Sequence, residues 1–492
     1  MPATSAPVYG AWSTQLQQQE RFTVCISNNA REYGGGSACL KELLANADDA
    51  KATSFTICLD ASQYRTDGLL HHGMAGLQGL ALWVGNNAEF SSQDWRNYTL
   101  NVGKSAKAND SATTTRFGKG ALTAYSLSDV IQVISGDDLL MLDPHGTHLP
   151  AQLQSVFGNL VNRKDDRFVD VAKECPGHLH SFQSFTNKCA DVPSFGIRRH
   201  YPGTLFRLSL RSQEAALRSE ISSESYTKDK FLQTLHTFIQ AAPDLLLFTR
   251  HVKAISVYLK HSADCACEVL HECRASSSSI SSLVSCQLQK VTVRILSADR
   301  GSPTNPGMTT KVWVKSTHIA IGRSEGNVAV LLQDDSAPGG NTLPKVVGKV
   351  YSIMALPLQN TNLPVHINGA FSMSADRRTL WAGEGDRGQV RTPLCLLCVK
   401  LQCTTGCKLF SINLHVLQVN LNGIVTRVII LRCPSVIWTC IAFSDPVIAL
   451  LYIYIYLYLY ISHSTLAVGE RKHCSLDSGR RPSICCCNRK QL

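Results

Sequence analysis

The feature that most constrains this chain is the segment CLKELLANADDAKATSF, residues 39–55, which mixes apolar and acidic side chains at a helical period. Its apolar face consists of Leu40, Leu43, Leu44 and Ala47. Glu42, Asn46 and Asp49 are spaced i, i+4 and i+7, so in an α-helix they lie along one adjoining face. Such a stripe offers a carboxylate base and oxygen ligands for a hard cation such as Mg²⁺. The alternative is an ordinary solvated face, and the stripe alone does not decide between them.

A second segment, RFGKGALTAYSLSDVIQVIS, residues 116–135, combines a Gly-x-Gly turn with a predicted helix and then a predicted strand. A turn of this kind at a helix start presents backbone N–H groups to an anion. The preceding residues 101–115, NVGKSAKANDSATTT, are rich in Gly, Ser and Thr and include Lys104. They favour a mobile lid over phosphates. An isolated Gly-x-Gly is usually only a turn.

In this order the segments resemble the Bergerat (GHKL) ATP-binding fold shared by gyrase, heat-shock chaperones, histidine kinases and MutL. The likeness extends to the sacsin repeat family through six segments: LKELLANADDAKAT, GLALWVGNNAEFSSQDW, RFGKGALTAYSLSDV, SGDDLLMLDPH, YPGTLFRLSLR and LPVHINGAFSMSADRRTLW. The resemblance covers about residues 20–385 and implies an α+β chain. It implies a Bergerat-type two-layer α/β sandwich over residues 15–212 and a middle-like α+β domain over residues 213–390.

The resemblance also implies a role for each matching residue. Glu42 would orient or deprotonate the attacking water, Asn46 would ligate Mg²⁺, and Asp49 would lie near the nucleoside. Gly118 and Gly120 would let the backbone approach the phosphates, and Thr204 would help to hold the adenine site. Lys104 and Lys119 are further candidates for contact with phosphate, although Lys119 is equally compatible with a side chain in solvent.

Two positions depart from the family pattern or have a competing interpretation. Asn87 stands where the superfamily has an aspartate that reads adenine. Its side-chain carbonyl can still accept a hydrogen bond from the adenine amine, but it lacks the negative charge that makes the bond of an aspartate stronger. Arg377 and Arg378 resemble the position from which chaperone middle domains send an arginine to the γ-phosphate. The competing interpretation of this pair, which we favour, is a surface cap of a turn before Trp381.

These roles imply ATP and Mg²⁺ as cofactors and a slow ATPase coupled to conformational change in protein quality control. The alternative is a degenerate interaction or scaffold module with weak nucleotide binding or none, favoured by Asn87 and Lys119. A third possibility is a DNA-repair or chromatin ATPase of the same superfamily, but no DNA-binding motif is visible in the sequence to support it. Partners would be protein clients or co-chaperones in the cytoplasm, and the chain would be a dimer or part of a larger chain.

The net charge of +11 does not require a nucleic-acid partner, because of where the charge lies. From residue 403 onward there are nine Lys or Arg and three acids, so +6 comes from the last 90 residues. The first 20 residues have no basic start and no apolar run, so we expect no secretory signal and hence reduced cysteines. The cysteine-rich segment 395–407 has the ligand number for zinc, but its middle spacer is short.

The tail, residues 391–492, reads differently from the rest of the chain. LLYIYIYLYLYIS, residues 450–462, alternates Tyr with Ile or Leu, as a strand apolar on both faces would. A membrane span over 447–461 is a second interpretation, although it falls short of the roughly 20 residues needed. We favour a third, in which the Tyr-Ile repeat is translated non-coding sequence.

Elsewhere the pattern predicts a helix over residues 228–249, broken at Pro243. Strands are predicted in the segments LALWV, VIQVIS, VKAISVYL, KVTVRIL, NVAVLL and VHING. The serine run SSSSISS, residues 276–282, is predicted to be a flexible turn or loop.

Overall fold

The computed structural model describes residues 21–33, 35–99, 120–150, 153, 158–283, 286–297, 307–318, 326–335, 346–352, 354–360, 365–369, 413–421, 424–433 and 436–442. The chain divides into two compact units, residues 1–391 and 392–492. In the second unit, β15 (Asn413–Leu421), β16 (Ile424–Cys433) and β17 (Val436–Ala442) form an antiparallel sheet.

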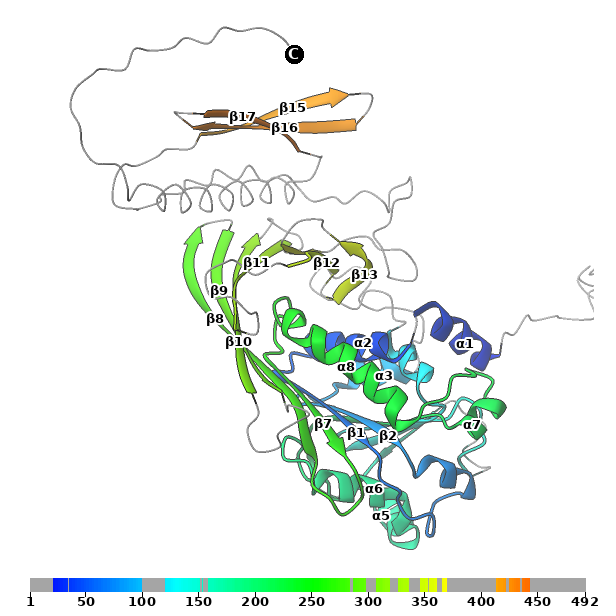
Figure 1. Cartoon of the computed structure of the whole chain (residues 1–492). Helices are drawn as coiled ribbons and strands as arrows, with labels where there is room; N and C mark the ends of the chain where they lie inside the picture. Colours follow the sequence, from blue (N-terminus) through cyan, green and yellow to red (C-terminus); the bar gives the residue numbers. More distant parts are fainter. Residues whose placement is uncertain are drawn as a thin grey trace, which may run out of the picture. The chain divides into compact units, whose positions relative to one another are not determined.

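The first unit alternates helices and strands over its N-terminal half and is mostly strands thereafter (Figure 1). Its helical elements are α1 (Phe22–Tyr33), α2 (Gly36–Asp49), the 3₁₀ helix η2 (His72–Leu77), α3 (Ser92–Thr99), the 3₁₀ helix η3 (Gly120–Ser126), α5 (Asp166–Glu174), α6 (Pro176–Thr186), α7 (Gln213–Arg218) and α8 (Lys228–Leu245). Its strands are β1 (Ser54–Asp60), β2 (Ala81–Asn86), β3 (Ile131–Gly136), β4 (Asp138–Leu142), β5 (Gly158–Asn162), β6 (Tyr201–Ser209), β7 (Ala254–Lys260), β8 (Glu268–Leu283), β9 (Cys286–Ser297), β10 (Gly307–His318), β11 (Gly326–Asp334), β12 (Lys349–Ser352), β13 (Met354–Asn360) and β14 (His366–Asn368). The mixed α+β class is therefore confirmed.

The strands form one open mixed sheet of 14 strands in the order β13-β12-β14-β11-β10-β9-β8-β7-β1-β2-β6-β3-β4-β5. At its centre β1 pairs antiparallel with β2 and parallel with β7. Residues on both sides of the predicted domain boundary at 212/213 thus share one sheet, and the boundary itself stays a prediction. Beyond β7, the long strands β8, β9 and β10 curve away from the helices (Figure 1).

Helices cover both faces of the central strands. One core joins α2 and α8 to one face of β1, β2, β3 and β6, through side chains such as Leu44, Phe55 and Phe238. A second core joins η2 and α6 to the opposite face, through Trp83 and Phe182 among others. The central strands thus have a helical layer on each face, and the Bergerat-type two-layer sandwich stays a prediction. β1 and β2 are buried along nearly their whole length, and strands buried on both faces need a cover on each.

The second layer comes from a region whose sequence pattern was not recognised as helical. The carboxylate of Asp165 caps α5 by accepting a hydrogen bond from the backbone N–H of Arg167, and α6 begins with Pro176, a residue favoured at that position. The two helices are short, at 9 and 11 residues, and only α5 has a clear amphipathic period. Their position is decided by the apolar face of the sheet that they cover.

The serine run is not a loop, and that prediction was wrong. Residues 276–282 lie inside β8 and pair with β9, with Ser276 opposite Thr292 and Ser282 opposite Gln287. Serine has no strong preference for strands, so this strand is set by its antiparallel neighbour rather than by its own sequence. The predicted strands LALWV, VIQVIS, VKAISVYL, KVTVRIL, NVAVLL and VHING are confirmed as parts of β2, β3, β7, β9, β11 and β14.

The predicted helix break at Pro243 was also wrong in detail. α8 begins after Thr227, whose hydroxyl accepts a hydrogen bond from the backbone N–H of Lys230, and it continues through Pro243 to Leu245. The proline falls within the last turn and costs one helical hydrogen bond. The packing of Phe238 and Leu245 in the core is enough to hold that turn in place.

Several sequence predictions lie outside the described residues, among them the cysteine-rich segment 395–407 and the apolar segment 447–461. Among the described helices, none is long and apolar enough to cross a membrane. The cysteines with described surroundings are free thiols, as expected, with Cys273 in the core and Cys265 exposed.

We predict that Trp83→Ala destabilises the fold by about 3–5 kcal/mol, the range for removing a large buried aromatic side chain. Trp83 is 1% exposed, stacks on Phe185 at 4.3 Å between ring centroids, and donates from Nε1 to Asp60 Oδ2 at 2.9 Å. Urea unfolding of the full chain measures the loss. Leu217→Ala, at a side chain 84% exposed, is the control and should change stability by less than about 0.5 kcal/mol. Equal effects of both variants would contradict a second core on this face.

Candidate functional site

Helix α2 carries three of the predicted site residues on one stripe. Glu42 is buried at 8% exposure, whereas Asn46 and Asp49 are half-buried. The helix packs closely at its start, where a Cβ on Gly36 would lie 3.1 Å from side-chain atoms of Leu127 and Thr234. It ends where Lys51 adopts a left-handed conformation with φ of 64°. The spacing read from the sequence is therefore realised in an α-helix.

Glu42 lies in the interior beside η3. The thiol of Cys39, one turn earlier, has a pKa raised to about 12, chiefly by burial; a hydrogen bond with Thr123 of η3 opposes this rise and the charge of Glu42 adds to it. η3 packs against α1 and α2. The predicted phosphate-turn residue Gly120 is its first residue. The carboxylate of Glu42 is thus held in a largely desolvated setting next to the element that follows the Gly-x-Gly turn.

Asp48, between Asn46 and Asp49 in sequence, has a different task. It is 1% exposed, and its carboxylate accepts three backbone hydrogen bonds from the loop after α8: from Arg250 at 2.9 Å, His251 at 2.7 Å and Val252 at 2.9 Å. We call this set of bonds the Asp48 clamp. This role was not predicted from the sequence, although the sequence contains one signal of it. Asp48 lies eight residues after Leu40 on the apolar stripe, and a buried carboxylate there must be hydrogen-bonded.

Asn87 lies at the end of β2 and is bonded to the start of β1. Its Oδ1 accepts hydrogen bonds from the backbone N–H of Thr53 at 2.8 Å and of Ser54 at 3.2 Å, and its Nδ2 donates to Thr53 Oγ1 at 2.7 Å. The two lone pairs of the carbonyl oxygen are matched by these two donors. To accept a hydrogen bond from an adenine amine, as the resemblance implies, Asn87 would have to release one of them.

Thr204 is fully buried at the same end of the sheet. Its hydroxyl donates to the carbonyl oxygen of Ala88 at 2.7 Å and lies 2.8 Å from Ser135 Oγ on β3. The β6 backbone approaches β2 closely here: Gly203 has φ of 142°, and a Cβ on it would lie 2.4 Å from the carbonyl oxygen of Asn86. A glycine before Thr204 is therefore required by the packing of the strands.

His200 joins two loops beside Thr204. Its Nε2 lies 2.9 Å from Glu89 and its Nδ1 lies 3.0 Å from Asp137, so it bridges the segment after β2 and the turn after β3. Hydrogen bonds with Glu89 and then Asp137 raise the pKa of His200 above its ordinary value. The protonated imidazole, which donates from both nitrogens, is thus the form that best fits this bridge.

The structure brings part of the predicted site together. The C-terminal end of α2 leads through Thr53 to Asn87, and Ala88 connects to Thr204, so these positions share one end of the central sheet. Glu42 lies two turns back along α2. Lys104, Gly118, Lys119, Arg377 and Arg378 lie outside the described residues, and their predicted roles stay predictions. Among the described residues, no cluster of three His, Cys, Asp or Glu side chains could hold a metal ion.

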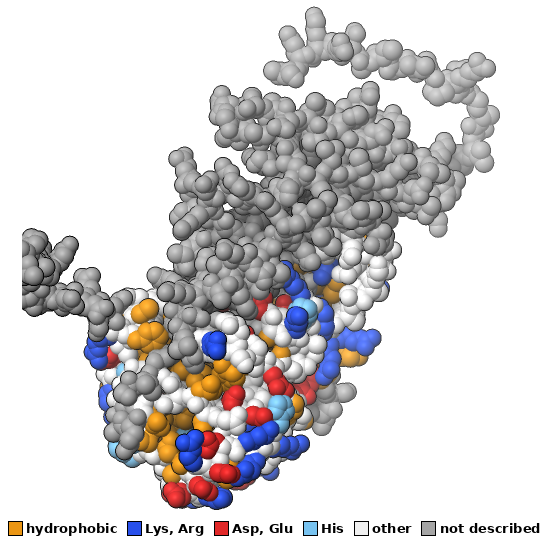
Figure 2. Space-filling view, turned by 180° about the vertical axis from the view of Figure 1, so that it is seen from behind, with side chains coloured by type: hydrophobic (Ala, Val, Ile, Leu, Met, Phe, Trp, Pro, Cys, Tyr) orange, Lys and Arg blue, Asp and Glu red, His pale blue; other side chains and the backbone are white. Residues whose placement is uncertain are grey.

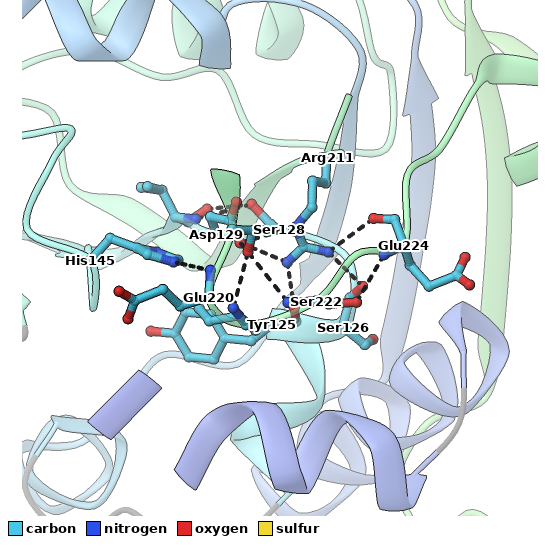
Figure 3. A network of polar contacts seen from close by, with 12 residues as sticks. Tyr125, Ser126, Ser128, Asp129, His145, Arg211, Glu220, Ser222 and Glu224 are labelled. Atoms are coloured by element: carbon cyan, nitrogen blue, oxygen red, sulfur yellow. Dashed lines mark hydrogen bonds and ion pairs between the residues drawn. The ribbon is translucent and has the colours of Figure 1, made fainter. Parts of the chain in front are cut away.

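A buried arginine, which received no role from the sequence, holds the end of η3 in place (Figure 3). Arg211 follows β6 and is 2% exposed. Its five N–H donors reach Asp129 Oδ1 twice, at 3.0 and 2.7 Å, and the backbone carbonyl oxygens of Tyr125, Ser126 and Glu224. The bonds tie the segment after η3 to the loop before α8. Lysine could not replace it, since it has three donors and no planar fork.

Comparison with known proteins yields two findings. Residues 19–272, more than half of the chain, match the family model described as the Sacsin domain. The chain is also 30% identical to human sacsin over 404 residues, which cover 74% of this chain and 8% of sacsin. The chain thus spans a small fraction of the length of that relative.

We predict that Asp48→Ala lowers the free energy of unfolding by at least about 4 kcal/mol, since three backbone N–H groups lose a charged acceptor and each such bond contributes about 1.5 kcal/mol or more. Asp48→Asn should fall between, because an amide oxygen keeps the two bonds from His251 and Val252. Urea unfolding of the full chain measures both. Asp170→Ala, an exposed α5 carboxylate, is the control, and an equally small loss for Asp48→Ala would contradict the clamp.

We predict that His200→Gln lowers the melting temperature at pH 5.5 and leaves it nearly unchanged at pH 9. The pKa of His200 is raised in the folded state, so its stabilisation is fully present below the unfolded value of about 6.5 and is lost as pH rises through the folded pKa. Calorimetry across this range measures the difference. His236→Gln, at an exposed position of α8, should show no such trend, and a pH-independent effect of His200→Gln would contradict the bridge.

Proposed function

The chain belongs to the Sacsin domain family, and from this premise we propose that it is an ATP-binding module with a Bergerat-type (GHKL) nucleotide site. In this proposal the module hydrolyses ATP slowly in a Mg²⁺-dependent reaction that is coupled to conformational change. A place in protein quality control, which the family resemblance implies, is part of this proposal; the chain spans 8% of human sacsin.

The observation that carries the proposal is the α2 stripe. Glu42, Asn46 and Asp49 are on one helix whose C-terminal end connects, through Thr53 and Asn87, to the polar end of the central sheet at Thr204. A carboxamide oxygen between two carboxylates is a donor set that suits Mg²⁺, which prefers oxygen ligands and usually takes few of them from the protein. The carboxamide of Asn46, half-buried on this stripe, supports the cofactors that the resemblance implies.

Each residue would have a defined task. Asn46 would contribute the protein ligand to Mg²⁺, Asp49 would line the nucleoside end, and Glu42 would orient the attacking water or accept its proton. Bound Mg²⁺ would supply charge neutralisation between the phosphates. Lys104, Gly118, Lys119 and Gly120 would contact the phosphates, and Arg377 or Arg378 would complete the site on domain docking.

A second candidate is a module that keeps the fold but binds nucleotide weakly or not at all and acts through protein interactions. The observation in its favour is Asn87, whose Oδ1 already accepts two backbone hydrogen bonds at the entrance to β1. Reading adenine through this residue would cost one of them. The two candidates differ in whether the full chain binds Mg²⁺-ATP.

The wider setting is also part of the proposal. We expect protein clients or co-chaperones as partners, a cytoplasmic location, and work as a dimer or as part of a larger chain. We expect no nucleic-acid partner, and no membrane partner unless residues 447–461 insert. Acidic and basic side chains are interspersed on the face drawn in Figure 2. This supports the expectation of no nucleic-acid partner, since a nucleic-acid-binding face concentrates positive charge. Neighbouring pairs such as Arg198 with Asp166 have the same effect locally.

We predict that the full chain binds ATP with Mg²⁺ in titration calorimetry, and that Asn46→Ala weakens binding at least about tenfold, or about 1.4 kcal/mol. The reason is the loss of the proposed metal ligand. Asn187→Ala, the same change at an exposed position after α6 on the opposite face of the sheet, is the control and should bind as wild type. Glu42→Ala should still bind, with turnover reduced by roughly 10²–10⁴ if it acts as the base.

A folded wild-type chain that gives neither heat nor thermal stabilisation with Mg²⁺-ATP would contradict the proposal. The second candidate, a protein-interaction module, would then remain. If Asn46→Ala binds Mg²⁺-ATP as wild type does, the chain has an ATP site, but Asn46 of α2 does not contribute to it.

A further inference from the structure

A cavity of 490 Å³ lies apart from the α2 stripe. One wall is the loop from α8 into β7, with residues 246–251 and 253. The other wall is formed by β8, β9 and β10, with Asn327 of β11 and Asn368 of β14 at its rim. Its volume is in the range of small-molecule sites, about 300–1,000 Å³. The proposed ATP site uses other residues and gives this cavity no role.

The lining of this cavity has one sign of charge. Arg250, Lys253 and Lys315 line it together with His251, and the described residues that line it include no Asp or Glu. Three basic side chains in one concave site make a potential that attracts anions, and low-dielectric walls strengthen it. The rest of the polar lining consists of amides and hydroxyls, for example Gln287, Gln289 and Thr317, which can hydrogen-bond an uncharged part of a ligand.

The cations approach from two elements and meet at the same loop. Lys315 Nζ, on β10, donates to the carbonyl oxygen of Leu247 at 3.2 Å, and Lys253 Nζ donates to that of Thr249 at 3.3 Å. Partial burial lowers the pKa of Lys253, while the charge of Asp48 opposes this change. An ammonium whose hydration is reduced in this way gains more from a bound anion than one in open solvent.

The loop is also held rigidly. Its backbone N–H groups at 250–252 are taken by the Asp48 clamp, and Thr249 Oγ1 donates to the carbonyl oxygen of Val252 at 2.8 Å. The carboxylate of Asp48, whose charge acts on Lys253, is thus engaged by the loop backbone. A wall fixed in advance loses little freedom when a ligand binds, which favours affinity.

We propose that the cavity between residues 246–253 and the strands β8–β10 is a binding site for a small organic polyanion that carries two or more phosphate groups. One group lies between Lys253 and Lys315 and a second contacts Arg250, whose planar fork suits a phosphate. The amides of Gln287 and Gln289 contact the organic part. The size of the cavity favours a molecule larger than inorganic phosphate.

The test is a titration of the full chain with inositol hexakisphosphate in EDTA, so that a Mg²⁺-dependent nucleotide site does not contribute. Binding in the micromolar range is expected, together with at least tenfold weaker binding by Lys253→Gln and by Lys315→Gln. Lys290→Gln is the matched control. It removes the same charge from β9, next to Gln289 and Val291 in the cavity wall, at an exposed position on the opposite face of the strand. Its affinity should stay within twofold of wild type.

Three outcomes would overturn the proposal: no binding by a folded wild-type chain, an equal loss with Lys290→Gln, or tighter binding of a poly-glutamate peptide than of inositol hexakisphosphate. Asn46→Ala should bind this probe as wild type does. Failure here and failure of the ATP proposal are thus separate results, because the two sites share no tested residue.

Discussion

The carboxylate of Asp48 is the interaction on which most of this arrangement depends. By accepting three backbone hydrogen bonds from residues 250–252, it joins the buried side of α2 to the loop between α8 and β7. The same loop leads into β7, which pairs parallel with β1, so the clamp fixes α2 relative to the centre of the sheet. A parallel pair needs a long connection between its strands, and here that connection, from β1 to β7, contains most of the N-terminal half of the unit. One carboxylate therefore closes a long loop in the chain.

The two faces of α2 have separate tasks. One side, with Leu40, Leu44 and Asp48, belongs to the core and the clamp. Glu42, which is also buried, forms with the half-buried Asn46 and Asp49 the stripe on which the proposed ATP chemistry depends. The loop held by Asp48 is in turn a wall of the basic cavity. The helix of the proposed ATP site and the proposed polyanion site are thus attached to each other through three short hydrogen bonds, although they share no lining residue that we invoke.

Much of the architecture could be read from the sequence where the pattern was periodic. The helix at Gly36–Asp49 and the strands around Trp83 and Val133 follow from regular apolar spacing. The serine strand and the helices α5 and α6 could not be read in this way, because their local preferences are weak and the neighbouring sheet decides their conformation. Of the candidate site, the stripe on α2 was predictable from spacing, and Thr204 only from a resemblance. The bonds of Asn87 to Thr53 link residues 34 positions apart, which no local pattern reveals.

The sequence by itself determined that residues 42, 46 and 49 lie on one helical stripe, because the period of an α-helix is a local property of the backbone. Only the tertiary structure decided which acid of that helix is structural. Asp48 and Asp49 are adjacent and identical in sequence, yet one is 1% exposed and bonded to a loop some 200 residues away, while the other is half-buried. The gathering of Arg250, Lys253 and Lys315 around a cavity was decided in the same way. Residues of such sets are brought together only by the folding of a long chain. Their charges interact more strongly in the fold because it excludes water around them.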